Sequence, residues 1–323
     1  MGSEMCIRDR TFTDSFSVSG KETSPQGLAF STDGTKMFIL GIADNDVTEY
    51  TLGTAWDVST ATFVDDKSVD QGTNYDKPRA IDFNSDGTKM RILWSDKDSV
   101  GEYTCTTGFD VSTCSYTSSE PMDISSQETE PEAIAFNTDG TKMFIVGAIG
   151  DDVYEYACST GFDVSTCSFT DAFSVTTQES APSGIAFNTD GTKMFVLGAN
   201  GEDVNEYVCS TGFDVSTCGS VADKDISGQE ANALAMAFNS DGTKMFIGGF
   251  AGDDVNEYTL STAYDVSTAT FVDAFSILTH EGKITGLAFD TNGNHMYIVG
   301  QGGVEINEYH LSVAWDVSTA SHK

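Results

Sequence analysis

Acidic residues recur in pairs along this chain, in short polar segments that could bind a hard divalent cation. Calcium prefers carboxylate oxygens, so these pairs are candidate ligands. The pairs lack the dense ligand spacing of a dedicated calcium loop, and this spacing favours the other interpretation, solvated surface charge. The candidate calcium ligands are Asp44, Asp46, Asp96, Asp98, Asp151, Asp152, Glu202, Asp203, Asp253 and Asp254.

Six of the seven cysteines form three pairs, each separated by nine positions: Cys105/Cys114, Cys158/Cys167 and Cys209/Cys218. The segment around each cysteine pair recurs in three further places along the chain, and these copies carry Leu52/Ala61, Leu260/Ala269 and Leu311/Ala320 at the same sites. Positions that change together are expected to be in contact, so the sequence predicts three disulfides. Disulfides indicate an oxidising compartment, either extracellular, at the cell surface or periplasmic. Metal-bound or reduced thiols are the alternatives, and no histidine accompanies the pairs.

A ligand-binding face is predicted from the most variable text, because recognition residues concentrate in loops on a rigid scaffold. Tyr75 and Arg79 stand in one such segment, and Trp94 is expected near the same face. Asp82 and Arg91 are predicted to lie opposite each other on neighbouring strands. A compensated ion pair is the favoured interpretation, and a polar ligand contact is the alternative.

Catalytic residues are not predicted at any position. The chain contains no nucleophile with its base, no phosphate-binding loop and no zinc signature. No cofactor-binding residue is predicted either, apart from the candidate calcium ligands. The glutamates that precede tyrosine in each copy are expected to pair with lysine or to bind backbone groups.

These residues belong to a unit that repeats six times, at intervals of 51 to 53 residues, starting near residues 27, 80, 133, 184, 235 and 286. In one unit, residues 184–187 alternate as a strand does, and Asp190-Gly191 predicts a hairpin turn into residues 193–197. Two further strands are expected around 204–209 and after Cys218. Four short antiparallel strands per unit are typical of a propeller blade.

The whole chain is therefore predicted to be an all-β, six-bladed propeller over residues 11–323, with four antiparallel strands per blade. The last copy lacks its outer strand, and the text of residues 11–18 matches the missing segment. We expect this N-terminal strand to complete the last blade and to remove two exposed edges. A fragment of a longer array is the alternative.

The phrase Ala186-Phe-Asn-Thr-Asp-Gly-Thr-Lys-Met-Phe-Val196 resembles the strand–turn–strand unit of YVTN-type and TolB-like propeller repeats. The resemblance covers all six copies and implies a β-propeller. It concerns a structural hairpin, so it implies no catalytic residues.

Residues 1–10 do not share the repeat. Their sequence matches the translation of a transposase adapter used in sequencing libraries, so we interpret them as a non-native segment and exclude them from the fold. The natural N-terminus is then expected to differ from the one printed.

The chain has 50 acidic and 16 basic residues, for a net charge of −34. Nucleic acids and anionic membrane surfaces need basic patches, so neither is an expected partner. The sequence also lacks the long apolar stretch that membrane insertion needs. A monomeric ring is expected.

Three functions remain open from the sequence. The first is a non-enzymatic, extracytoplasmic binding or adhesion module for a protein, glycan or polymer, because repeated copies suit repeated weak contacts. The second is a calcium-dependent, lactonase-like hydrolase with its site at the mouth of the channel. The third is a structural spacer within a larger surface or viral protein.

Overall fold

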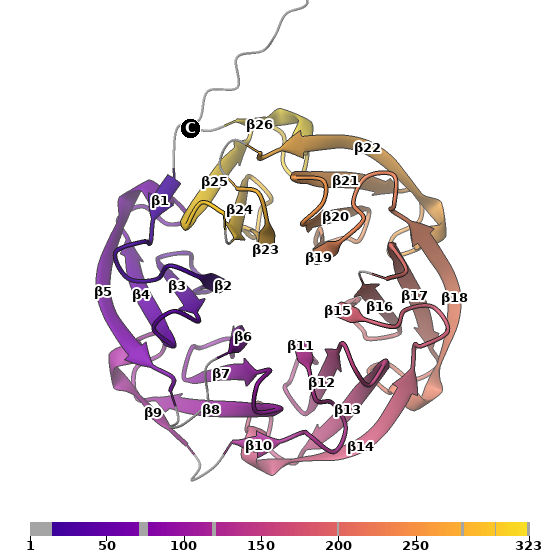
Figure 1. Cartoon of the computed structure of the whole chain (residues 1–323), viewed down its shortest axis with the longest axis horizontal. Helices are drawn as coiled ribbons and strands as arrows, with labels where there is room; N and C mark the ends of the chain where they lie inside the picture. The colour runs from indigo at the N-terminus through magenta and orange to yellow at the C-terminus, as the bar shows by residue number, and fades with distance from the viewer. Residues whose placement is uncertain are drawn as a thin grey trace, which may run out of the picture.

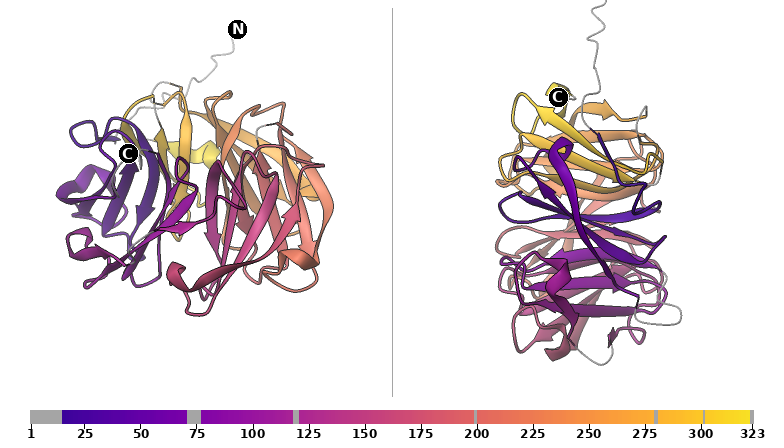
Figure 2. Two further views of the ribbon diagram at one scale, coloured as in Figure 1. Left: turned by 60° about the horizontal axis from the view of Figure 1, so that its bottom comes forward. Right: turned by 90° about the vertical axis from the view of Figure 1, so that its left-hand side faces the viewer.

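The computed structural model describes residues 15–70, 77–117, 121–198, 200–278, 281–300 and 302–321. Six antiparallel sheets stand around a central channel, and each sheet is one blade (Figure 1). Figure 2 shows the same blades from the side, with their connecting loops on both faces of the ring. The prediction of an all-β, six-bladed propeller is confirmed.

In blades 1 to 5 the strands are ordered outward from the channel as they follow in the chain, whereas β1 (Ser15–Ser17) is an outer strand of blade 6. Blades 1 to 3 comprise β2 (Pro25–Phe30), β3 (Lys36–Gly41), β4 (Asp46–Leu52) and β5 (Ala61–Ser68); β6 (Pro78–Phe83), β7 (Lys89–Trp94), β8 (Ser99–Cys105), β9 (Cys114–Tyr116) and β10 (Met122–Asp123); β11 (Pro131–Phe136), β12 (Lys142–Gly147), β13 (Asp152–Cys158) and β14 (Cys167–Ser174). In blade 2, β9 and β10 both pair with β8.

Blades 4 to 6 repeat this arrangement, and the N-terminal strand completes the last one. They comprise β15 (Pro182–Phe187), β16 (Lys193–Gly198), β17 (Asp203–Cys209) and β18 (Cys218–Asp225); β19 (Ala233–Phe238), β20 (Lys244–Gly249), β21 (Asp254–Leu260) and β22 (Ala269–Ser276); β23 (Ile284–Phe289), β24 (His295–Gly300), β25 (Glu305–Leu311), β26 (Ala320–Ser321) and β1 (Ser15–Ser17).

The ring closes where β1 pairs with β25, with Phe16 opposite Ile306. The Phe16 ring also packs edge-on against Tyr50 of blade 1, at 5.0 Å between ring centroids. The ammonium of Lys21 lies 2.8 Å from the Asp66 carboxylate of the same blade. The closing segment therefore joins blades 6 and 1. The prediction for residues 11–18 is confirmed over Ser15–Ser17, and residues 11–14 lie outside the described residues.

The Asp-Gly turns have a steric cause. Gly34 has φ +69°, and a Cβ there would lie 2.2 Å from the Trp56 ring. The Asp33 carboxylate meanwhile accepts hydrogen bonds from the Thr35 backbone and hydroxyl, at 3.0 and 2.7 Å. Only glycine combines this positive φ with the close approach of an aromatic ring.

A buried glutamate, called here the clasp glutamate, accepts a backbone hydrogen bond across each interface between neighbouring blades; the six are Glu49, Glu102, Glu155, Glu206, Glu257 and Glu308. In blade 3 the buried Glu155 carboxylate lies 2.6 Å from the Lys142 ammonium and accepts a 2.9 Å hydrogen bond from the Val215 backbone of blade 4. The Lys142 ammonium also donates to the Phe213 carbonyl, at 2.6 Å. In blade 6, His295 replaces the lysine and lies 2.7 Å from Glu308. The repeated glutamates thus bind both lysine and backbone, as the sequence predicts.

The three predicted disulfides are present, and each joins residues that face each other across the two outer strands. They link Cys105 to Cys114, Cys158 to Cys167 and Cys209 to Cys218. Helices in the described part of the chain are short 3₁₀ turns, and none is long and apolar enough to cross a membrane.

Candidate functional site

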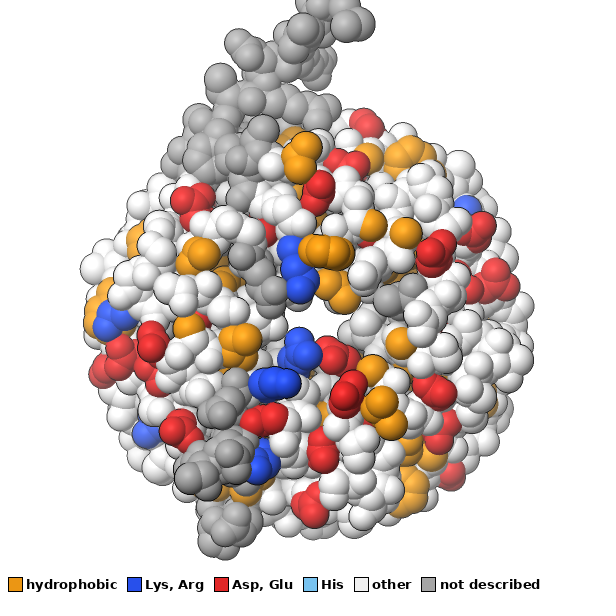
Figure 3. Space-filling view, viewed as in Figure 1, with side chains coloured by type: hydrophobic (Ala, Val, Ile, Leu, Met, Phe, Trp, Pro, Cys, Tyr) orange, Lys and Arg blue, Asp and Glu red, His pale blue; other side chains and the backbone are white. Residues whose placement is uncertain are grey.

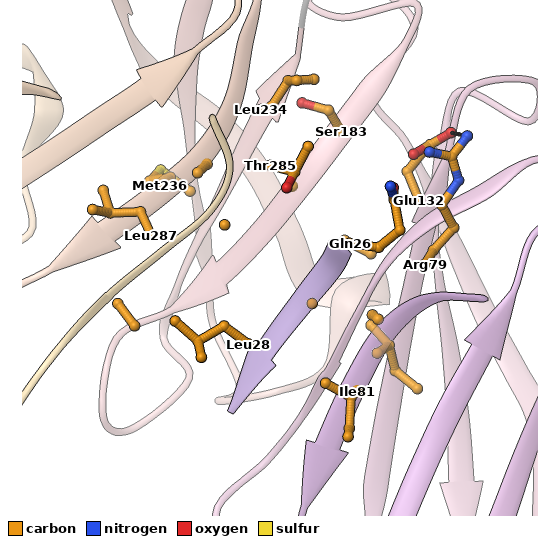
Figure 4. A pocket seen from close by; sticks show the side chains of 18 of the residues that line it. Gln26, Leu28, Arg79, Ile81, Glu132, Ser183, Leu234, Met236, Thr285 and Leu287 are labelled. Atoms are coloured by element: carbon orange, nitrogen blue, oxygen red, sulfur yellow. Dashed lines mark ion pairs between the residues drawn. The ribbon is translucent and has the colours of Figure 1, made fainter. Parts of the chain in front are cut away.

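The mouth of the central channel is lined by the second residue of each innermost strand. A β-bulge follows the first residue of each of these strands, so the second residue is left unpaired in the ladder. All six are different side chains, although the surrounding text is nearly the same in each copy. We call them the channel-mouth ring (Figure 4): Gln26, Arg79, Glu132, Ser183, Leu234 and Thr285.

An aliphatic collar lies two residues further along the same strands. Small residues separate the ring from the collar, and the channel space that both line is about 260 Å³. A ligand at the mouth would therefore meet polar groups at the surface and aliphatic side chains beneath them. The collar consists of Leu28, Ile81, Ile134, Ile185, Met236 and Leu287.

Arg79 and Glu132 form an ion pair in the ring, at 3.3 Å between guanidinium and carboxylate. The Nε atom of Arg79 also donates to the Ser95 hydroxyl, at 3.3 Å. Burial raises the pKa of Glu132, Arg79 partly offsets this effect, and the nearby carboxylates of Glu130 and Glu128 add to it. Carboxyl groups with a raised pKa in a concave site are candidates for ligand binding or proton transfer.

The uncharged members of the ring offer acceptors and an amide. The Ser183 hydroxyl donates to the Ala233 carbonyl at 3.0 Å, and the Thr285 hydroxyl donates to the Val299 carbonyl at 3.3 Å. Because each hydroxyl donates its hydrogen to a backbone carbonyl, its oxygen lone pairs can accept a hydrogen bond from a ligand.

The structure describes two of the three predicted ligand-face residues, Arg79 and Trp94. Arg79 is at the channel mouth, but it belongs to strand β6 and not to a loop. The prediction for Trp94 is wrong, because its side chain is fully buried and cannot contact a ligand at the surface. It fills the space beside Gly101, where a Cβ would lie 2.3 Å from the indole ring. Tyr75 lies outside the described residues.

Asp82 and Arg91 face each other across β6 and β7 and form the predicted ion pair. The guanidinium of Arg91 is buried and lies over the rings of Phe136 and Phe162 of blade 3, at 4.5 and 4.9 Å. The other copies have an aromatic residue in place of Arg91. This pair is therefore part of the interface between blades 2 and 3.

Five buried glutamates, which the sequence analysis did not single out, hold the acidic loops in place. The Glu128 carboxylate accepts from the Glu130 backbone at 2.8 Å and from the Gly150 backbone at 3.0 Å. The sequence contains a signal for these glutamates, because each follows a Val or Ile by four residues. In the structure that Val or Ile is buried, and each glutamate packs against a glycine of the second strand. The five are Glu22, Glu128, Glu179, Glu230 and Glu281.

The candidate calcium ligands lie where predicted, in the loops between the second and third strands or at the start of the third. Within the described ranges, no group of three or more His, Cys, Asp or Glu side chains is arranged to hold a metal ion. Burial raises the pKa of Asp46, Asp98 and Asp254, and it raises the pKa of Asp203 to about 6. Calcium binding stays a prediction.

No protein-family model matches the chain, and no curated protein matches it in sequence. Among solved structures, it is similar to a protein from Lactobacillus plantarum, with 15% identity and a TM-score of 0.64 over 92% of this chain and 83% of that one. A Bacteroides fragilis protein, provisionally named a 6-phosphogluconolactonase, has 14% identity and a TM-score of 0.62 over 91% and 81%. A luciferin-regenerating enzyme has 13% identity and a TM-score of 0.59 over 95% and 92%. At such identities the likeness establishes the β-propeller fold alone.

Proposed function

We propose that this protein is a binding module that recognises a saccharide, or a similar polyhydroxylated molecule, at the channel mouth. One observation carries the proposal: the six copies are nearly alike, yet the channel-mouth ring has a different side chain from each blade. A specific site needs different groups that converge, and this position supplies them. The three disulfides support an oxidising, extracytoplasmic location for such a module.

The chemistry of the ring suits hydroxyl groups. The Arg79–Glu132 pair presents donors beside an acceptor, which is the pattern that two neighbouring hydroxyls can match. Gln26 adds an amide, and Ser183 and Thr285 add acceptor oxygens. Charged partners make the stronger hydrogen bonds in such a site, so Arg79 and Glu132 are expected to contribute most to affinity.

The test is a screen of soluble saccharides by saturation-transfer NMR, followed by titration of the tightest ligand. Ser183→Trp would fill the channel mouth and is expected to abolish binding. Thr106→Trp adds the same bulk at an exposed site on the opposite face and is expected to leave affinity unchanged. Circular dichroism and thermal unfolding would verify that both variants fold. The proposal is overturned if no saccharide binds, or if both variants bind as the unmodified protein does.

A second candidate is hydrolysis of a sugar lactone at the same site. The raised pKa of Glu132 beside Arg79 favours it, as does the provisional name of the Bacteroides fragilis neighbour. Glu132 would take a proton from water, and the resulting hydroxide would attack the lactone carbonyl, with Arg79 beside the developing oxyanion. The ring C–O bond then breaks, and Glu132 returns the proton to the leaving alkoxide.

A pH-stat assay with aldonolactones separates the two candidates. Turnover above the spontaneous rate that disappears in Glu132→Gln, even at saturating lactone, would favour the hydrolase. Binding without turnover would favour the binding module.

A further inference from the structure

Basic side chains of the described residues lie in several places, among them the blade interfaces and the channel mouth. Arg91 is buried against Asp82, and five lysines bind the clasp glutamates: Lys36, Lys89, Lys142, Lys193 and Lys244. Arg79 and Lys283 instead line the channel mouth. Figure 3 shows Lys and Arg side chains gathered around the central opening, although the chain carries a net charge of −34.

The two cations come from blades on either side of blade 1. Arg79 is on β6 of blade 2, and Lys283 directly precedes β23 of blade 6, so Gln26 of blade 1 lies between their strands in the order of the ring. Ser95 and Glu132 orient the Arg79 guanidinium. The ammonium of Lys283 lies 5.3 Å from the ring centroid of Phe250, which is 50% exposed. The mouth thus carries cations from blades 2 and 6, and an exposed aromatic ring lies beside the Lys283 ammonium.

The opposite charge lies on the neighbouring blade 3. Glu132 belongs to the ring itself, and Glu130 lies close enough to raise its pKa. These carboxylates can accept hydrogen bonds from hydroxyl groups, and they disfavour a ligand with more than one negative charge. The mouth therefore suits a monoanion that also carries hydroxyl donors.

We propose that the ligand of this site is an acidic saccharide whose single carboxylate is bound by Arg79 and Lys283. Its hydroxyls donate to Glu132, and its ring packs against Phe250. This inference rests on the proposed saccharide-binding function and adds the charge of the ligand. Arginine binds carboxylates through two parallel hydrogen bonds, which gives this contact both strength and orientation.

Matched ligands test the charge directly: the methyl glycoside of a single uronic acid and the methyl ester of the same glycoside, titrated by calorimetry at constant ionic strength. The ester keeps the hydroxyls and removes the charge. Charged hydrogen bonds are worth about 1.5–3 kcal/mol, so the acid is expected to bind roughly tenfold or more tightly than the ester.

Matched variants then test which residue causes the preference for the acid over the ester. Lys283→Gln is expected to reduce the preference for the acid several-fold, because Arg79 still binds the carboxylate, and to leave ester affinity unchanged. Lys224→Gln is the control: it removes the same charge from β18, where Lys224 lies 5.8 Å from the Tyr258 ring. That variant is expected to keep the preference.

The outcomes separate the two proposals. Equal affinity for acid and ester, or a preference of unchanged size in Lys283→Gln, overturns the acidic ligand while saccharide binding stands. Failure of both probes and of all neutral saccharides overturns the proposed function and the inference with it.

Discussion

Asp203, at the start of β17, faces Asp225 across the two outer strands of blade 4. Like charges directly opposite each other destabilise a sheet. Burial raises the pKa of Asp203 to about 6, and the charges of Asp223, Glu179 and Asp225 add to this effect. A hydrogen bond from the Asn205 amide, at 2.5 Å, acts in the opposite direction.

This carboxyl makes the stability of the protein depend on pH. Its pKa in the unfolded chain is about 3.9, so the folded state binds the proton more tightly. The stabilising contribution is complete below about pH 4 and is lost as the pH rises through about 6. We expect Asp203→Asn to be more stable than the unmodified protein at pH 7, by about 1 kcal/mol after allowance for solvent screening.

Thermal unfolding of both proteins between pH 4 and 7.5 measures this effect. The melting temperatures should be closest at the acidic end and should diverge as the pH rises. Parallel profiles across this range would assign the pH dependence to other carboxyls.

At the scale of elements, the interface between blades 2 and 3 differs from the others. Its buried Arg91 lies on two phenylalanine rings of blade 3, and Asp82 is its counterion. Removal of one partner from a buried ion pair costs about 3–5 kcal/mol, whereas replacement of both by apolar groups is often neutral or stabilising.

We therefore expect Asp82→Ala alone to lower the free energy of unfolding by about 2 kcal/mol, because it leaves Arg91 buried without its counterion, although Asp82 itself is 40% exposed and partly screened by solvent. The double variant Asp82→Ala/Arg91→Phe adopts the residues of the other blades and is expected to recover most of this loss. Urea denaturation measures the free energy of unfolding of the single and double variants, and so gives both the loss and the recovery. If the loss in the double variant equals the sum of the losses in the two single variants, Asp82 and Arg91 do not stabilise each other.

The elements were more predictable than the site that they form. Asp-Gly pairs and alternating apolar residues locate the hairpins, because the turn and the strand each need particular residues. Asp82 and Arg91 were paired correctly, since a two-residue turn sets the register between their strands. The channel-mouth ring was missed because a bulge turns Glu132 and Ser183 into the channel. Trp94 was misplaced because a paired change was overlooked: Trp94 replaces a glycine of the other copies, and Gly101 replaces a larger residue, which leaves room for a buried indole.

At the scale of the whole molecule, stability depends on closure of the ring. The closing segment pairs with β25, buries Val18 and contacts blade 1 through Phe16 and Lys21. Removal of residues 1–18 would expose the edge of β25, and an unpaired edge promotes association with other chains.

We expect removal of residues 1–18 to lower the melting temperature and to produce oligomers in size-exclusion chromatography with light scattering. Removal of residues 1–10 is the control and is expected to change neither, because these residues are interpreted as non-native. An unchanged, monomeric protein after the longer deletion would mean that blade 6 is stable without its fourth strand.

The disulfides all lie in three consecutive blades, numbers 2, 3 and 4, and each joins residues nine positions apart. Under mechanical force, a covalently closed loop does not extend, so each bridge withholds about 30 Å of contour length from the stretched chain. Blades 1, 5 and 6 carry Leu and Ala at these sites and can extend fully. The ring is thus covalently reinforced over half of its circumference, and reduction would make the two halves equally extensible.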